Sequence, residues 1–242
     1  GATWAVVGHL FLDHCTKAEC LTSKNASVYS YSPPWYRDPY SDIAREPMRY
    51  GKDVVEMLLS DGPLQEIGYH SYSHPVFTDI PREMAEGEIA QAKEIEQRWG
   101  IRLRSFVFPQ DKVAHVDLLA KHDFLIYRGA AARRRRPDMP PLKRKLNGAM
   151  DKVLSRPVRP QFKEGVWEIP SSMPFSDPRT PSTALFRAKV GLRRTLSAGG
   201  VFHVFMHPWN LLLSDRTRAD LDALLGLVSE RRDAGELEVM TM

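Results

Sequence analysis

The sequence predicts an α/β fold with a parallel β-sheet, built either as an open doubly wound sheet or as a barrel. Short β-rich runs alternate about six times with helical patterns, and such strand–helix repeats place helices outside a parallel sheet. The 242 residues, 43% of them hydrophobic and 26% charged, are enough to bury one sizeable core. This composition excludes a disordered chain, collagen and a coiled coil.

Seven β-rich runs are expected to form strands, because β-branched and aromatic residues dominate them. They cover residues 3–7, 65–69, 104–108, 124–128, 166–170, 201–206 and 237–240.

Helical patterns lie between these runs. The clearest has Pro81 near its first turn and an apolar stripe along one face. We expect its cap at Thr78 or Asp79 and its end at Gly100. Further helices are expected at 51–60, 115–122, 181–198 and 215–234.

Residues 130–165 carry the excess positive charge. This basic insertion has eleven Lys or Arg against three acidic residues, with Arg133–Arg136 consecutive, whereas the rest of the chain has 23 basic and 27 acidic residues. Its five prolines oppose both sheet pairing and a long helix, so we expect a mobile insertion. It is either a solvated loop or a surface for an anionic partner, such as a phospholipid membrane or a phosphorylated glycan. Nucleic acid is not expected, because aromatic residues that stack on bases are scarce here.

Residues 14–50 interrupt the alternation with a long loop that contains Trp35 and five tyrosines. Long ordered loops often carry function, and aromatic faces suit sugar rings. The alternative is a loop that folds onto its own hydrophobic cluster.

Cys15 and Cys20 allow a local disulfide, a metal pair or two thiols, of which we expect two thiols. The sequence predicts neither a membrane span nor a signal peptide, and it does not define a compartment.

Two histidine pairs have a spacing of four residues. His70 and His74 follow the expected strand at 65–69, and across a turn both imidazoles can reach one metal ion at about 2.0 to 2.1 Å. His203 and His207 lie on one expected strand, about 13 Å apart, so they cannot share an ion. We therefore expect His70 and His74 to be ligands of a divalent metal, the alternative being capping or packing.

Other polar residues also follow expected strands. In α/β folds the active site gathers at the carboxyl ends of parallel strands. Gln110 and Asp111 follow the run at 104–108, and His207 follows the run at 201–206. We expect His207 to act as an acid or base at the mouth of the site.

Several segments occur in a recognisable order: 1–8 (GATWAVVG), 66–75 (EIGYHSYSHP), 106–109 (FVFP), 127–129 (YRG) and a strand that ends at His207-Pro208. In these segments the chain resembles the polysaccharide deacetylases with NodB-like domains. EIGYHSYSHP is the most specific of them. Because the resemblance covers nearly everything except the basic insertion, residues 1–242 are expected to form a single deacetylase-like catalytic domain.

The resemblance implies a distorted (β/α) barrel, a divalent metal such as zinc, and removal of an N-acetyl or O-acetyl group from a polysaccharide or glycan. His70 and His74 would hold the metal, which would activate water and polarise the acetyl carbonyl. His207 would protonate the departing amine, and the Gln110 N–H would help to hold the oxyanion. The residues expected to line the sugar site are Trp209 and Asn210.

The chain departs from the family in its acidic residues. The paired-acid motif at the end of the family's first strand, which supplies a metal ligand and the base, has no counterpart in the sequence. We expect this motif and the first strand to precede Gly1, so that the barrel lacks its first strand and this chain alone is nearly inactive. The alternative is that Asp111 is the base as the substitute within the chain, and the chain would then be active without that motif. Val107 replaces the arginine that braces the base in the family, which predicts a divergent branch.

Two other functions fit the same residues. One is a non-enzymatic carbohydrate-binding or scaffold protein on this fold, and the other is a metal-dependent hydrolase of a non-sugar amide. An acidic pair upstream of Gly1 would favour the enzyme, and its absence would favour the binding protein.

Overall fold

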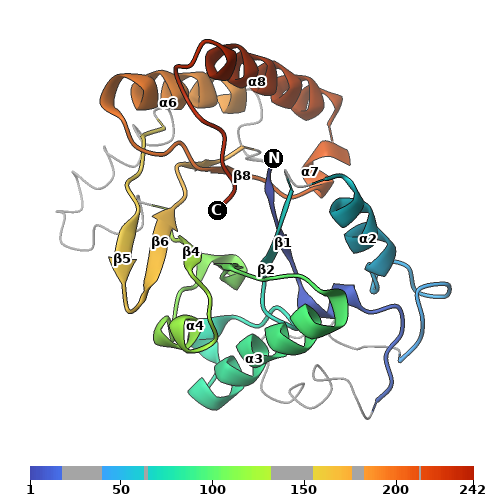
Figure 1. Cartoon of the computed structure of the whole chain (residues 1–242). Coiled ribbons are helices and arrows are strands. Elements are labelled where there is room, and N and C mark those ends of the chain that lie inside the picture. The colour runs from blue at the N-terminus through green and yellow to red at the C-terminus, as the bar shows by residue number, and fades with distance from the viewer. Residues whose placement is uncertain (18–39, 63–64, 132–154, 176–182, 213) are drawn as a thin grey trace. The chain divides into compact units, whose positions relative to one another are not determined.

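The computed structural model describes residues 1–17, 40–62, 65–131, 155–175, 183–212 and 214–242 (Figure 1). By its internal contacts the chain forms two compact units. The first unit comprises 1–129, 162–168 and 240–242, and the second comprises 130–161 and 169–239. A single catalytic domain over 1–242 stays a prediction.

A six-stranded sheet, in the order β1-β2-β3-β4-β6-β5, belongs mostly to the first unit (Figure 1). The strands are β1 (Thr3–Val6), β2 (Glu66–Tyr69), β3 (Ser105–Val107), β4 (Ile126–Gly129), β5 (Gln161–Lys163) and β6 (Val166–Pro170). β1 to β4 are parallel neighbours, with Thr3 paired to Glu66 and Ser105 to Ile126. The predicted α/β class with a parallel sheet is therefore confirmed.

The helices of the first unit lie where the periodicity predicts them. They are α2 (Lys52–Ser60), α3 (Arg82–Trp99) and α4 (Asp117–Lys121). α3 ends at Gly100, whose φ of 64° gives the left-handed cap that glycine favours. The predicted cap at Thr78 or Asp79 is wrong, because these residues lie in the 3₁₀ turn η3 (Phe77–Asp79) and Pro81 is the N-cap. The residue before a proline is pushed out of the helical region, so the helix cannot begin earlier.

Aromatic side chains form much of the core of the first unit. Phe106 of β3 lies at the centre, with its ring centroid 4.8 to 6.0 Å from those of Tyr69, Phe77, Phe108 and Phe124. All five side chains are almost fully buried, and all four contacts are edge-to-face. Each such pair adds about 0.5–1.5 kcal/mol beyond the buried area. The cluster therefore holds β2 and β3 firmly, and candidate site residues follow both strands.

β5 and β6 form a hairpin at the end of the basic insertion. Glu164 and Gly165 have φ values of 50° and 83°, and two consecutive positive φ angles are typical of a type I′ hairpin turn. The prediction that 130–165 does not pair in a sheet is therefore wrong at 161–163, where the segment has no proline. Residues 132–154, including Arg133–Arg136, lie outside the described residues.

The second unit contains a short parallel pair of strands and helices. Its elements are β7 (Met173–Pro174), β8 (Val204–Phe205), α6 (Ala184–Ala198), α7 (Trp209–Leu212) and α8 (Asp215–Asp233). Its core includes Met173, Phe175, Ala188 and Leu224.

Two predicted strands differ from the structure. The run at 201–206 contributes only β8, and Val201 forms an isolated antiparallel bridge with Val158. The run at 237–240 forms no strand in the structure. A strand needs a hydrogen-bonded neighbour, which local alternation of apolar residues does not guarantee. Within the described ranges, no helix is both long enough and apolar enough to cross a bilayer.

Candidate functional site

His70 and His74 lie on a tight loop that leaves the carboxyl end of β2. The N–H of His70 donates to the Val6 carbonyl oxygen at 2.9 Å and continues the pairing of β2 with β1. The two imidazole rings lie with their centroids 4.6 Å apart and their planes at 81°. The structure therefore brings the two predicted metal ligands together.

The orientation of His70 is fixed by the neighbouring strand. Its Nδ1 lies 2.6 Å from the carbonyl oxygen of Val107, the last residue of β3. Because a carbonyl oxygen only accepts, Nδ1 carries the proton, and in the neutral ring the lone pair is on Nε2. A ring nitrogen that donates to a backbone carbonyl is the usual arrangement behind a metal-binding histidine.

The histidine loop has an unusual backbone. Ser71 and His74 have φ values of 60° and 62°, in the left-handed region that non-glycine residues seldom adopt. The Ser71 hydroxyl oxygen accepts from the His74 N–H at 3.0 Å, and the Ser71 carbonyl oxygen accepts from the Gly8 N–H at 2.8 Å. A side chain on Gly8 would meet Tyr72 Cδ2 at 2.8 Å, so glycine lets the two segments approach. Such strained positions are concentrated at functional sites.

Asp111 and Arg128 form a second polar group at the ends of β3 and β4. Arg128 Nη2 donates to Asp111 Oδ1 at 2.7 Å, and their side chains are 13% and 18% exposed. Gln110 and Asp111, with φ values of 54° and 56°, form the turn that leads out of β3. Val107 lies between this group and the histidines, because its carbonyl oxygen contacts His70 and it pairs with Arg128 in the sheet.

His207, Trp209 and Asn210 belong to the second unit. The imidazole of His207 stacks on the Trp209 indole, with centroids 4.1 Å apart and planes at 16°. The Asn210 side-chain oxygen accepts from the His207 N–H at 3.1 Å, and His207 and Trp209 are exposed. The three residues thus form one local cluster after β8. Their predicted roles in acid catalysis and sugar binding stay predictions.

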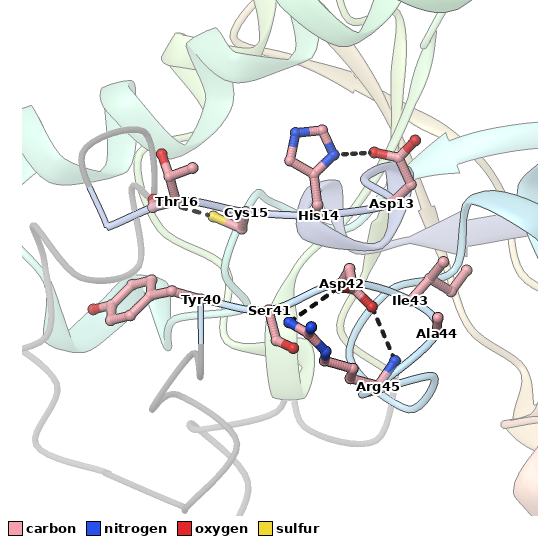
Figure 2. Close-up of a pocket in the computed structure, with 10 residues that line it drawn as sticks. All are labelled: Asp13, His14, Cys15, Thr16, Tyr40, Ser41, Asp42, Ile43, Ala44 and Arg45. Carbon is pink, nitrogen blue, oxygen red and sulfur yellow. Dashed lines mark hydrogen bonds and ion pairs between the residues drawn. The ribbon is translucent and has the colours of Figure 1, made fainter.

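An open pocket of about 580 Å³ lies elsewhere in the first unit, between segments 13–16 and 40–45 (Figure 2). Lys52 and His14 both bond the Asp13 carboxylate, at 3.0 and 2.6 Å, and lower its pKa to about 2. Cys15 is buried, and its Sγ contacts the Thr16 carbonyl oxygen. Residues 18–39, which contain Trp35, Cys20 and three of the five predicted loop tyrosines, lie outside the described residues.

Two residues near the predicted site were missed as site residues from the sequence. Arg128 is the partner of Asp111, and Glu88 of α3 contacts the histidine loop. Glu88 has a signal in the sequence, since this carboxylate lies on the buried stripe of α3 beside Ala85, Ile89 and Ala92. Arg128 has no signal in the sequence other than its position at the end of an expected strand.

In the described part of the chain, no group of three or more His, Cys, Asp or Glu side chains lies close enough to hold a metal ion. The His70–His74 pair fits as two ligands of such an ion by its ring spacing and by the Nδ1 contact of His70.

A scan against protein-family models and a search of curated proteins gave no match. Among solved structures, the chain is similar to a crystal structure of a "putative polysaccharide deacetylase from Mycobacterium smegmatis". The TM-score is 0.51 at 16% sequence identity, over 83% of this chain and 71% of that chain. The α-amylase AmyC from Thermotoga maritima matches with a TM-score of 0.33 at 16% identity, over 71% of this chain and 32% of that one. The first likeness shows a shared fold, and the second is too weak to support an argument.

Proposed function

We propose that this chain belongs to a metal-dependent deacetylase that removes acetyl groups, N-linked or O-linked, from a polysaccharide or glycan. The observation that carries the proposal is the His70–His74 pair, with His70 oriented through Nδ1 by the Val107 carbonyl oxygen. The shared fold with the mycobacterial structure supports the same class of activity. A polysaccharide-deacetylase type of (β/α) barrel is part of this proposal.

Zinc suits the proposed site because neutral imidazole is one of its common ligands. His70 would bind through Nε2, since Nδ1 donates to Val107. His74 would bind from the other end of the same loop. When bound, the metal would polarise the acetyl carbonyl and lower the pKa of a water molecule.

Asp111 is our proposed general base. Its carboxylate would accept a proton from the attacking water, while Arg128 holds one of its oxygens at 2.7 Å. Arg128 would take the bracing role that the family gives to the arginine replaced by Val107. The Gln110 N–H would donate to the developing oxyanion.

A carbohydrate-binding or scaffold protein is the second candidate. It is favoured by the absence, among the described residues, of a third side chain that completes a metal cluster with the two histidines. A binding protein needs the loop and the fold but not the metal. Binding of an anionic glycan or membrane through Arg133–Arg136 is compatible with both candidates and stays a prediction.

Acetate release separates the two candidates. The 242-residue chain, loaded with Zn²⁺, is incubated with N-acetylated and O-acetylated oligosaccharides, and acetate is measured alongside oligosaccharide binding. Release that disappears in Asp111→Asn and in His70→Ala supports the enzyme. Binding without release in wild type supports the binding protein.

A further inference from the structure

We infer that Glu88, a buried residue of α3, is the positioning residue that fixes the loop carrying His70 and His74. This inference deepens the proposed function and rests on it for its connection to metal binding. Glu88 Oε2 accepts from the N–H of Tyr72 at 3.0 Å and from the N–H of Ser73 at 2.8 Å. Its Oε1 accepts from the Ser73 hydroxyl at 2.5 Å.

The burial of Glu88 makes these contacts energetically important. The residue has no exposed surface, and an ionised carboxylate in such a place costs several kcal/mol unless hydrogen bonds compensate it. Hydrogen bonds to a charged acceptor are roughly twice as strong as neutral ones. The loop provides three of them, so the helix and the loop each satisfy the other's polar groups.

The contacts fall at the centre of the loop, between the two candidate ligands. Tyr72 and Ser73 lie between Ser71 and His74, the two residues with left-handed backbone angles. A loop with such angles is held only when its surroundings determine it. By fixing the two N–H groups between them, Glu88 sets where the His74 ring lies relative to the His70 ring.

A further contact ties the same point of α3 to β2. The Tyr69 hydroxyl donates to the Glu88 carbonyl oxygen at 2.9 Å. Tyr69 immediately precedes His70, so Glu88 contacts the chain on both sides of the first histidine. The helix thus holds the chain just before the loop and at the centre of the loop.

The test measures Zn²⁺ and Co²⁺ affinity of the full 242-residue chain by titration below the melting temperature of every variant. Glu88→Gln keeps the size of the side chain and removes its charge, and we expect it to weaken binding of both ions by about 10- to 100-fold. The visible absorption bands of bound Co²⁺ should also shift, because they report the geometry of the ligands. Glu94→Gln, on an exposed position of the same helix, is the matched control and should leave affinity and spectrum unchanged.

A second variant covers the case in which Glu88→Gln does not fold. Ser73→Ala removes only the hydroxyl that bonds Oε1, and we expect it to weaken Zn²⁺ binding by at least about threefold. Wild-type affinity and an unshifted Co²⁺ spectrum in folded Glu88→Gln would overturn the inference. If that variant is unfolded, wild-type affinity in Ser73→Ala would overturn it.

A metal-free measurement separates this inference from the proposed function. If wild type binds no Zn²⁺, or if His70→Ala and His74→Ala bind it normally, the proposed function fails. The ¹⁵N signals of the two imidazoles in the metal-free chain still decide the role of Glu88. They should shift or broaden in folded Glu88→Gln, or in Ser73→Ala if Glu88→Gln is unfolded, and stay unchanged in Glu94→Gln. Unchanged signals in the deciding variant would show that Glu88 does not position the loop.

Discussion

Arg128 Nη2 donates to Asp111 Oδ1 at 2.7 Å, and this contact joins the residues that follow β3 to the strand beside it. Both side chains are mostly buried, at 13% and 18% exposure, so solvent screens the pair less than an exposed pair. The contact with the arginine fixes the direction of the Asp111 carboxyl group. A fixed direction is what the proposed role of Asp111 as general base requires.

Asp111→Asn is predicted to lower deacetylation by about 10²- to 10⁴-fold, because an amide cannot accept the proton of water. Zn²⁺ affinity should remain close to that of wild type, since Asp111 is proposed as base and not as ligand. Turnover and metal content are measured on the same sample. Asp123→Asn, at an exposed ion pair with Lys93, is the control. Full turnover in Asp111→Asn would make Asp111 only the structural partner of Arg128.

Wild-type protein is predicted to hold about one zinc ion per chain, and His70→Ala and His74→Ala should each remove it. One remaining imidazole is too weak an anchor for the ion. Elemental analysis after dialysis measures the content, with His14→Ala, an exposed histidine elsewhere in the first unit, as control. Metal retained in both loop variants would exclude the site.

His207→Ala is predicted to leave the zinc content unchanged and to reduce turnover by about 10²- to 10⁴-fold, the usual contribution of a positioned general acid. The comparison with His207→Gln controls for loss of the stacking contact with Trp209. Loss of zinc in His207→Ala would indicate a metal ligand instead. Normal turnover would leave the histidine a structural role.

Acid conditions should weaken the contribution of Asp13 to stability. Bonds from Lys52 and then His14 lower the pKa of this carboxyl from 3.8 to about 2. A lowered folded-state pKa stabilises the fold above the unfolded-state value and loses that effect as pH falls from about 4 to 2. The melting temperature of wild type should therefore exceed that of Asp13→Asn near neutral pH, and the difference should shrink across this window. Because Asp13 is 43% exposed, the difference is expected to be small and to decrease with salt. A difference that does not change between pH 4 and 2 would contradict the assignment.

Much of the first unit is predictable from local sequence. The run at 166–170 coincides with β6, and the stripe that ends at Gly100 coincides with α3, because burial on one side imposes a period that the residues display. The hairpin that contains β5 is harder to predict from the sequence. Its three strand residues form too short a pattern within a segment dominated by charged residues and prolines. Of the run predicted at 201–206, only β8 forms a strand, because only these residues pair with β7. The local sequence of the run does not reveal this pairing partner.

The candidate site is predictable only in part. His70 and His74 are found through their spacing and their position after a strand. The contact of Arg128 with Asp111 depends on the register of β3 and β4, in which Val107 pairs with Arg128. The role of Glu88 depends on where the Tyr72 and Ser73 N–H groups point, and therefore on the left-handed angles of Ser71 and His74. Such backbone angles cannot be read from residue types.

The order of strands in the sheet has a consequence for the time course of folding. Ser105 pairs with Ile126, whereas Thr3 pairs with Glu66 over a separation of 63 residues, roughly three times as long. Closing the longer loop costs about 1 kcal/mol more in chain entropy. β3 and β4 should therefore join early and β1 should add late. The histidine loop, whose backbone bonds Val6 at the end of β1 and Gly8 just after it, would reach its final shape only in that last step.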